Sequence, residues 1–367
     1  MTHPPRPHGP SRREFLAAAG AALPWAACAP APRMPAPAAA APPPRLIDCQ
    51  SHLFCPEIVA RMEKRDRDPV VRVRDGVRTV VMGDWRRKIL SHYSDVDAKL
   101  AAMDAAGVVR AALSVNDPGP EWFGDEGADV ARILNDFVAG VVQRHPSRFF
   151  GLCVLPLQDE KAARAELDRC AASLGMRGIL LYTNLAGRFP DEPPFRWLFH
   201  RAAELDLPVL LHPALPVTAQ QVKGYEMIST LGNMFDDTLA LTRIILSGIL
   251  DEVPALRLVC PHLGGTLPYI VGRLDHQVTV LKRGPQNLAC APSEYLRRVW
   301  LDIVSPLPPA MKYAADLVGA DRLLFASDHP WVEPRLIRDN LLSLGLPAPD
   351  EAKILSGNAA SLFRLPA

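Results

Sequence analysis

Three histidines and one aspartate stand at points of the sequence where chemistry could be done. His52 ends the apolar run "LIDCQSH", His212 lies in "PVLLHP", His262 ends "LRLVCPH", and Asp328 lies in "LLFASDHP". Each of these residues alone is more often structural than functional. Three imidazoles and a carboxylate that converge at one place, however, suit a borderline divalent cation such as zinc. Such an ion would lower the pKa of a bound water toward about 7 and thereby supply a nucleophile.

Gln50 is the unexpected member of this group, because it precedes His52 by two residues. Residues two apart in a strand face the same side, so Gln50 and His52 should share one interior. An amide oxygen is a neutral and weaker ligand for zinc than an imidazole or a carboxylate. We therefore expect Gln50 either to ligate a metal weakly or to hydrogen-bond with whatever fills the site.

Short apolar runs alternate with amphipathic segments from Arg45 onward. The runs are "LIDCQSH", "VRAALSV", "FFGLCVLPL", "GILLYT", "PVLLHP", "LRLVCPH", "VWLDIVS" and "LLFASDHP", and between them lie segments such as "DVDAKLAAMDAAG" and "ADVARILNDFVAGVVQRH". Near-continuous apolar strands that are each followed by a helix predict a parallel sheet covered by helices. Eight such strands close a barrel, so we predict a distorted TIM (β/α)8 barrel. The turn "CQSHLF" lacks the glycine-rich phosphate loop expected of an open doubly wound sheet.

The barrel places the candidate residues at one face. His52 would end the first strand, His212 the fifth, His262 the sixth and Asp328 the eighth, and chemistry in such barrels sits where the strands end. A polar, arginine-rich insertion over residues 53–94 separates the first strand from its helix and should lie over the mouth. The fourth strand, "GILLYTN", has no lysine that could bridge two metals, so a single ion is expected.

The first 44 residues are expected to form a separate part, before a barrel domain over 45–367. "SRREFLAAAGAALPWAAC" begins with a paired Arg12 and Arg13 and looks like a twin-arginine export signal, whereas a disordered basic start is the alternative. "APAPRMPAPAAAAPPP" is a Pro/Ala tether that cannot pack a core. We predict export to the periplasm, and Cys28 is a candidate lipid-modified residue that would tether the chain to a membrane.

Composition narrows the class of protein. The 367 residues are 49% hydrophobic with a net charge of +1, so a large core can form and nothing favours a nucleic-acid partner. No apolar run reaches the roughly 20 residues that a spanning helix needs. The six cysteines after Cys28 are scattered through apolar stretches, which indicates buried thiols instead of a disulfide framework.

The chain resembles the amidohydrolase superfamily, in the branch related to aminocarboxymuconate-semialdehyde decarboxylase. The motifs that carry the resemblance run from Leu46 to Phe363, and they are "IDCQSH", "AAMDAAGV", "PVLLHP", "HLGGTLPYIVGRLD", "FASDHP" and "SGNAASLF". The resemblance implies that His52 and His212 ligate the metal and that Gln50 stands where the family has histidine or glutamate. It also implies that His262 is the general acid/base, and that Asp328 both ligates and accepts a proton.

Two arginines are candidate substrate contacts. The resemblance matches Arg273 to an arginine that helps decarboxylases hold a substrate carboxylate, sometimes across a dimer contact, so a homodimer is left open. Arg188, in the loop after the fourth strand, hints at an acidic group on a small-molecule substrate. An arginine that the decarboxylases carry on the first barrel helix has no match here, because "DAKLAAMD" offers only Lys99.

Three functions follow from these residues. The leading interpretation is a metal-dependent hydrolase that attacks a small cyclic or carboxylate-bearing lactone, ester or amide through metal-activated water. The second is a non-oxidative decarboxylase at the same site, with His262 protonating the carbanion. The third is a binding protein on a catalytically impaired barrel, for which Gln50 is the best argument. Metal content separates the third from the others, and release of carbon dioxide separates the first two.

Overall fold

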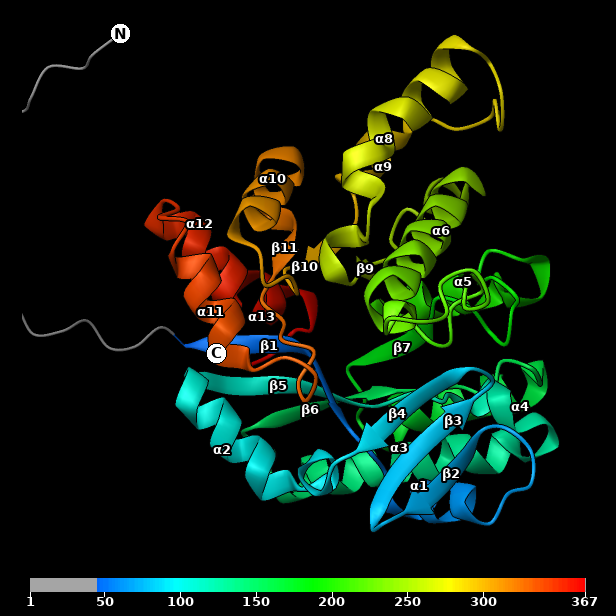
Figure 1. The fold of residues 1–367 in the computed structure, drawn as a ribbon. Coiled ribbons are helices and arrows are strands. Elements are labelled where there is room, and N and C mark those ends of the chain that lie inside the picture. The colour runs from blue at the N-terminus through cyan, green and yellow to red at the C-terminus, as the bar shows by residue number, and fades with distance from the viewer. Residues whose placement is uncertain (1–44, 367) are drawn as a thin grey trace, which may run out of the picture. The chain divides into compact units, whose positions relative to one another are not determined.

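Eight parallel strands form the centre of the domain. The computed structural model describes residues 45–366, and the predicted export signal, the tether and Cys28 lie outside them. The sheet has the strand order β1-β5-β6-β7-β8-β9-β10-β11. Their bounds are β1 Leu46–Leu53, β5 Val108–Val115, β6 Phe149–Cys153, β7 Gly178–Tyr182, β8 Val209–His212, β9 Leu258–Cys260, β10 Trp300–Asp302 and β11 Leu323–Leu324. Figure 1 shows β1, β5 and β6 side by side, with helices outside them.

The barrel is closed by the segment that follows β11. Cys49 N donates to Phe325 O at 3.0 Å, His52 N donates to His329 O at 2.8 Å, and Asp328 N donates to Gln50 O at 2.9 Å. These bonds join the first strand to the end of the last one, so the predicted barrel is confirmed. β11 is shorter than the apolar run "LLFASDHP", because the chain leaves regular strand geometry before Asp328.

The helices follow the strands as the alternation predicts. Their bounds are α1 Pro56–Glu63, α2 Val96–Ala106, α3 Gly127–Arg144, α4 Glu160–Ala172, α5 Trp197–Glu204, α6 Asn233–Leu246, α7 Ile249–Glu252, α8 Leu267–Asp275, α9 Pro292–Leu296, α10 Pro308–Val318, α11 Pro334–Leu342, α12 Ala348–Ala352 and α13 Asn358–Leu362. Local signals fix their ends. Asp95 caps α2 by accepting from the Asp97 and Ala98 backbone amides, and α2 ends at Gly107 with φ 78°.

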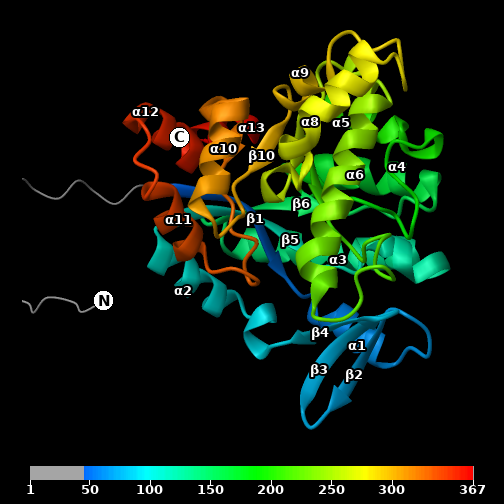
Figure 2. The same ribbon diagram turned by 45° about the horizontal axis from the view of Figure 1, so that its top comes forward.

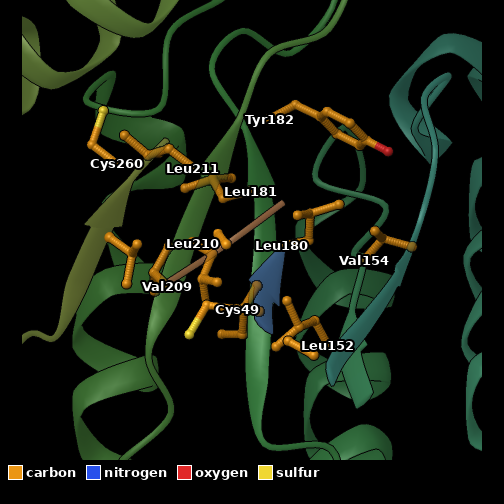
Figure 3. Close-up of a cluster of buried hydrophobic side chains, with 14 of the residues drawn as sticks. Cys49, Leu152, Val154, Leu180, Leu181, Tyr182, Val209, Leu210, Leu211 and Cys260 are labelled. Atoms are coloured by element: carbon orange, nitrogen blue, oxygen red, sulfur yellow. The ribbon is translucent and has the colours of Figure 1, made fainter. Parts of the chain in front are cut away.

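The core lies between the strands and the helices, and within the barrel itself. Figure 3 shows one cluster that gathers Cys49 of β1, Leu152 of β6, Leu180 of β7 and Leu210 of β8. All four side chains are buried. The six cysteines of the described part are free thiols, and five of them are buried, as predicted. None of the described helices is long and apolar enough to cross a membrane.

The insertion after β1 forms a small sheet of its own. β2 (Val70–Arg74), β3 (Val77–Met82) and β4 (Trp85–Ile89) are antiparallel and lie together at one edge of the barrel (Figure 2). The turn between β2 and β3 is Asp75-Gly76, with φ 50° and 77°, which is the conformation that an Asp-Gly hairpin turn adopts. Trp85 and Arg87 of β4 line the same cavity as His212 and Asp328, so the insertion covers the mouth as predicted.

Candidate active site

Three of the predicted ligands meet at the face of the barrel where the strands end. His52 lies in β1, His212 ends β8, and Asp328 follows β11. His52 Nε2 is 3.1 Å from Asp328 Oδ1, and His212 Nε2 is 3.8 Å from the same oxygen. One ligand atom of each residue lies within 4.8 Å of the others. The structure thus brings together three residues from distant parts of the sequence.

The two imidazoles present their Nε2 atoms to this centre because their other nitrogens are engaged. His212 Nδ1 donates to the Pro213 carbonyl oxygen at 2.7 Å, which leaves a lone pair on Nε2. His52 Nδ1 lies 2.7 Å from Ser114 Oγ. Both Nε2 atoms are buried and have no hydrogen-bond partner in the described part of the chain. Buried unpaired acceptors are costly, and a shared cation would satisfy both, so these residues fit a divalent metal ion.

The protonation states also suit a metal. Burial and the nearby His212 lower the pKa of His52 to about 4, so its imidazole is neutral at pH 7. Burial raises the pKa of Asp328, but the neighbouring imidazoles of His212, His262 and His52 outweigh it and hold the pKa well below its usual range. Metal ligands must be deprotonated to bind, and both of these residues meet that condition.

Gln50 contacts the same carboxylate from the side of β1. Its Nε2 donates to Asp328 Oδ1 at 3.1 Å, and its side chain is almost fully buried. Gln50 and His52 therefore face the same interior, as the strand alternation predicts. In this arrangement the amide acts as a hydrogen-bond donor to Asp328.

Replacing Gln50 by histidine is expected to raise zinc affinity by about tenfold or more, since outer-shell changes alone shift affinity by roughly 10–100-fold. Imidazole is a stronger ligand than an amide, and position 50 already reaches Asp328. Calorimetric zinc titration of wild-type and Gln50→His protein measures the change. Unchanged affinity would retire the weak-ligand account and indicate that the Gln50 amide instead serves the substrate.

His262 approaches Asp328 from the other side of the centre. It follows β9, and its backbone N donates to Asp302 Oδ1 at 2.8 Å. Its Nδ1 lies 2.8 Å from Asp237 Oδ2, and its Nε2 lies 3.7 Å from Asp328 Oδ2. Burial lowers the pKa of His262, but the carboxylates of Asp237 and Asp328 outweigh it and raise the pKa well above its usual value. The His262 imidazole is thus fixed close to the centre, with a raised pKa that favours its protonated form.

A buried polar network fixes the segment that carries Asp328. Asp48 Oδ1 accepts from the Ser327 backbone amide at 3.0 Å. The Lys99 ammonium donates to His329 O at 3.2 Å and lies 2.7 Å from His329 Nδ1. Residues on both sides of Asp328 are therefore anchored, which stabilises a backbone with φ 60° at Asp328 itself. Such non-glycine outliers concentrate at functional sites.

A cavity of about 470 Å³ opens in front of these residues. His212, His262 and Asp328 line one part of it, and Arg87 of the insertion lines another. The remaining wall is mixed, and it includes Trp85, Ser229, Asn233, Met234, Leu263, Val304 and Trp331. The Arg87 guanidinium lies 4.3 Å from the Trp85 ring and 4.6 Å from the Trp331 ring. The cavity therefore offers a cationic side chain, flat aromatic walls and the candidate metal centre to one small molecule.

The two arginines proposed as substrate contacts do not line this cavity. Arg188 pairs with Glu192 at 3.0 Å and lies over the Phe195 ring. Arg273 is exposed on α8, so within one chain it does not reach the cavity, and a contact across a dimer stays a prediction. Sequence reasoning missed Arg87, which stands among several arginines of the insertion, and Asp237, which looks like an ordinary solvent-facing acid of helix α6.

Glu121, a buried acid close to Asp117, has a charge state that can be tested. Both carboxylate oxygens of Glu121 are buried without a partner among residues 45–366. Burial, together with Asp117, raises the pKa of Glu121 from 4.5 to about 8. Between pH 4.5 and about pH 8, the folded state therefore binds one more proton than the unfolded state. This contribution to stability is complete below pH 4.5 and is lost as the pH rises through about 8.

The Glu121→Gln variant is expected to lose much less stability than the wild type between pH 5 and pH 9. The difference should be a few kcal/mol, because one unit of pKa corresponds to about 1.4 kcal/mol. Urea unfolding at the two pH values measures it, with Glu57→Gln, a change of an exposed glutamate, as the matched control. Parallel pH profiles of the wild type and Glu121→Gln would show that Glu121 is ionised in the folded protein.

The fold and the site together define a class of metal-dependent barrel enzymes, and comparison with known proteins agrees. The amidohydrolase family model matches residues 47–365, so the chain belongs to the amidohydrolase family. It is 27% identical over 299 residues to 2-amino-3-carboxymuconate-6-semialdehyde decarboxylase of Dictyostelium discoideum, covering 78% of this chain and 82% of that one. It is 29% identical over 308 residues to gamma-resorcylate decarboxylase of Rhizobium sp. strain MTP-10005, covering 78% and 92%.

One of the similar solved structures contains a bound metal ion. The dihydroxybenzoic acid decarboxylase of Polaromonas sp. JS666, with bound manganese and the inhibitor 2-nitroresorcinol, has a TM-score of 0.73 and 26% identity, covering 88% of this chain and 97% of that one. The resemblance to the aminocarboxymuconate-semialdehyde decarboxylase branch is thereby confirmed. The chain is an enzyme of this superfamily with a divalent metal site. Among the functions that the sequence left open, decarboxylation is better supported than hydrolysis.

Proposed function

We propose that this enzyme removes a carboxyl group, without oxidation, from a small aromatic or unsaturated acid. The position of His262 carries the proposal. Its Nδ1 is bonded to the buried Asp237, and its Nε2 faces Asp328 at the cavity. A histidine held in this way is a proton donor, and decarboxylation needs a proton at the carbon that loses the carboxylate. A hydrolase would instead need a base that takes a proton from water.

Residues of this chain can supply the proton that the reaction consumes. Breaking the bond between the carboxylate and the ring leaves its electron pair on the carbon and releases carbon dioxide. His262 donates its Nε2 proton to that carbon, and the imidazole is then protonated again from solvent. Asp237 holds Nδ1–H throughout, so the ring keeps its orientation while the Nε2 proton moves.

His52, His212 and Asp328 would hold the metal, with Gln50 beside them. When it is bound, the metal supplies positive charge that orients an acidic substrate and stabilises developing negative charge. We favour zinc because imidazole nitrogen suits it, whereas the neutral amide at position 50 also accommodates a harder ion such as manganese. Manganese in the Polaromonas decarboxylase supports a divalent ion at this site.

Release of carbon dioxide tests the proposal. Protein loaded with zinc or manganese is offered a panel of hydroxybenzoic acids, including 2,6-dihydroxybenzoate, and a second panel of lactones and esters. We expect metal-dependent release of carbon dioxide from at least one acid. The His212→Asn variant, which lacks one ligand, is the control and should release none. Hydrolysis of the second panel without carbon dioxide from the first would restore the hydrolase interpretation.

We also propose that the enzyme is exported and acts in the periplasm, either free or tethered through Cys28. The support is the pair Arg12-Arg13 and the apolar stretch after it, together with the Pro/Ala tether that follows. Fractionation of cells that express the full chain and an Arg12→Lys, Arg13→Lys variant tests this location. Export of the wild type alone is the expected result.

A further inference from the structure

Arg87 is the cationic side chain of the cavity, and it already has a carboxylate partner. Its Nη2 donates to both the side-chain Oδ1 of Asp117 and the Asp117 backbone oxygen. Asp117 follows β5, and its side chain is completely buried, whereas the Arg87 side chain keeps 14% exposure and lines the cavity. The Arg87 guanidinium of this ion pair therefore faces the cavity, whereas the Asp117 carboxylate is buried away from it.

The pair is rigidly placed. The Arg87 guanidinium lies between the rings of Trp85 and Trp331. Each indole is itself held by a hydrogen bond. Trp85 Nε1 donates to Ser229 Oγ at 3.1 Å, and Trp331 Nε1 donates to Asn116 Oδ1 at 3.0 Å. Arg87 cannot swing away from Asp117 without leaving these aromatic faces. Its charge therefore stays paired while a small molecule occupies the cavity.

Among residues 45–366, Arg87 is the only cationic side chain that forms an ion pair with Asp117. Asp117 Oδ2 has no hydrogen-bond partner within the described chain, and the nearby Glu121 and the Tyr182 hydroxyl are likewise buried and unpartnered. The guanidinium is thus matched by one full negative charge. A substrate carboxylate that reaches Arg87 would meet a neutral pair and would lose its hydration without gaining a net counter-charge.

We propose that Asp117 is a specificity-determining residue that restricts the enzyme to monocarboxylic acids, with a neutral substituent at the Arg87 end of the cavity. Hydroxyl, methoxy or carbonyl oxygens can accept from the guanidinium without bringing a second charge. Acids with a second carboxylate at that position are disfavoured. This inference rests on the proposed function, because it assumes that the reacting carboxylate lies at the metal centre.

Two probes that differ by one carboxylate test it. Salicylate is a monoanion, and 5-carboxysalicylate carries a second carboxylate across the ring from its hydroxyl. Their affinities for the zinc-loaded enzyme are measured by calorimetry for the wild type, for Asp117→Asn and for Asp75→Asn. The last variant removes an exposed charge at the far end of the same insertion and is the matched control. Asparagine at 117 keeps an oxygen that accepts from Arg87 but removes the negative charge.

We expect the wild type and Asp75→Asn to bind salicylate at least about tenfold more tightly than 5-carboxysalicylate, because the second carboxylate would lose its hydration beside an ion pair that is already neutral. In Asp117→Asn the uncompensated guanidinium should remove or reverse this preference. A wild type that prefers the dianion would overturn the inference even if Asp117→Asn does not fold. Unchanged selectivity in a folded Asp117→Asn would overturn it as well. Failure of both probes to bind any metal-loaded form would instead count against the proposed function.

Discussion

Asparagine at position 262 is expected to lower kcat by about 10²- to 10⁴-fold while the metal stays bound, because general acid catalysis contributes a factor of that size. His262 is the proton donor in the proposed reaction, and it is paired with Asp237 and faces Asp328. It is not among the three residues that converge as ligands, so its loss should leave metal content unchanged. Steady-state kinetics and elemental analysis of the purified variant provide the two measurements.

A matched control is available on the next helix. His276 lies just after α8, where it is exposed and outside the cavity. The His276→Asn variant should retain wild-type kcat and KM. Normal turnover in His262→Asn would refute the acid role, whereas loss of both turnover and metal would make His262 a ligand instead.

Removal of the metal should abolish turnover and also destabilise the fold. His52, His212 and Asp328 come from β1, β8 and the segment after β11, so an ion that joins them ties together strands on different sides of the barrel. Metal at about 100 times its Kd contributes about 2.7 kcal/mol to the free energy of unfolding. Urea unfolding and activity assays before and after chelation measure both effects.

Adding metal back shows whether the loss of activity and stability comes from removal of the metal or from damage by the chelator. Adding zinc or manganese back should return both activity and stability to the wild-type protein, and it should return neither to His212→Asn. Full turnover in a preparation that elemental analysis shows to be metal-free would contradict the assignment of these three residues.

The sequence predicted the barrel and the convergence of His52, His212 and Asp328, because both depend on local pattern. Each strand is an apolar run that ends at a polar residue, and parallel strands bring such ends to one face. That rule alone places His52, His212 and Asp328 at one face, and the structure brings both imidazoles within 4 Å of the Asp328 carboxylate. Gln50 followed from the alternation of side chains within β1, and its contact with Asp328 agrees.

The substrate end of the site could not be predicted in this way, since it depends on contacts between segments far apart in sequence. Arg87 reaches the cavity from an antiparallel insertion whose position over the mouth sets which of its many arginines faces inward. The first barrel helix, α2, carries no arginine, and Arg87 of the insertion lines the cavity instead. Lys99, which stands on that helix, is instead buried behind the ligands.

Asp237 shows the same limit within a helix. α6 is amphipathic, and an acidic residue in such a helix normally faces water. Asp236 and Asp237 are both buried. Asp236 accepts hydrogen bonds from Thr183 and Asn184, and Asp237 is paired with His262. Helical periodicity gives the face of a residue, but only the packing of α6 against the loop after β9 identifies its partner.

Decarboxylation in heavy water tests the central claim most directly. The zinc- or manganese-loaded enzyme is incubated in D2O with the acid from the panel that releases carbon dioxide, and the product is analysed by mass spectrometry and NMR. The proposed reaction predicts one deuterium at the carbon that lost its carboxylate, together with an equimolar amount of carbon dioxide and a large loss of both in His262→Asn. Carbon dioxide released without deuterium at that carbon, or released equally fast by His262→Asn, would contradict the claim.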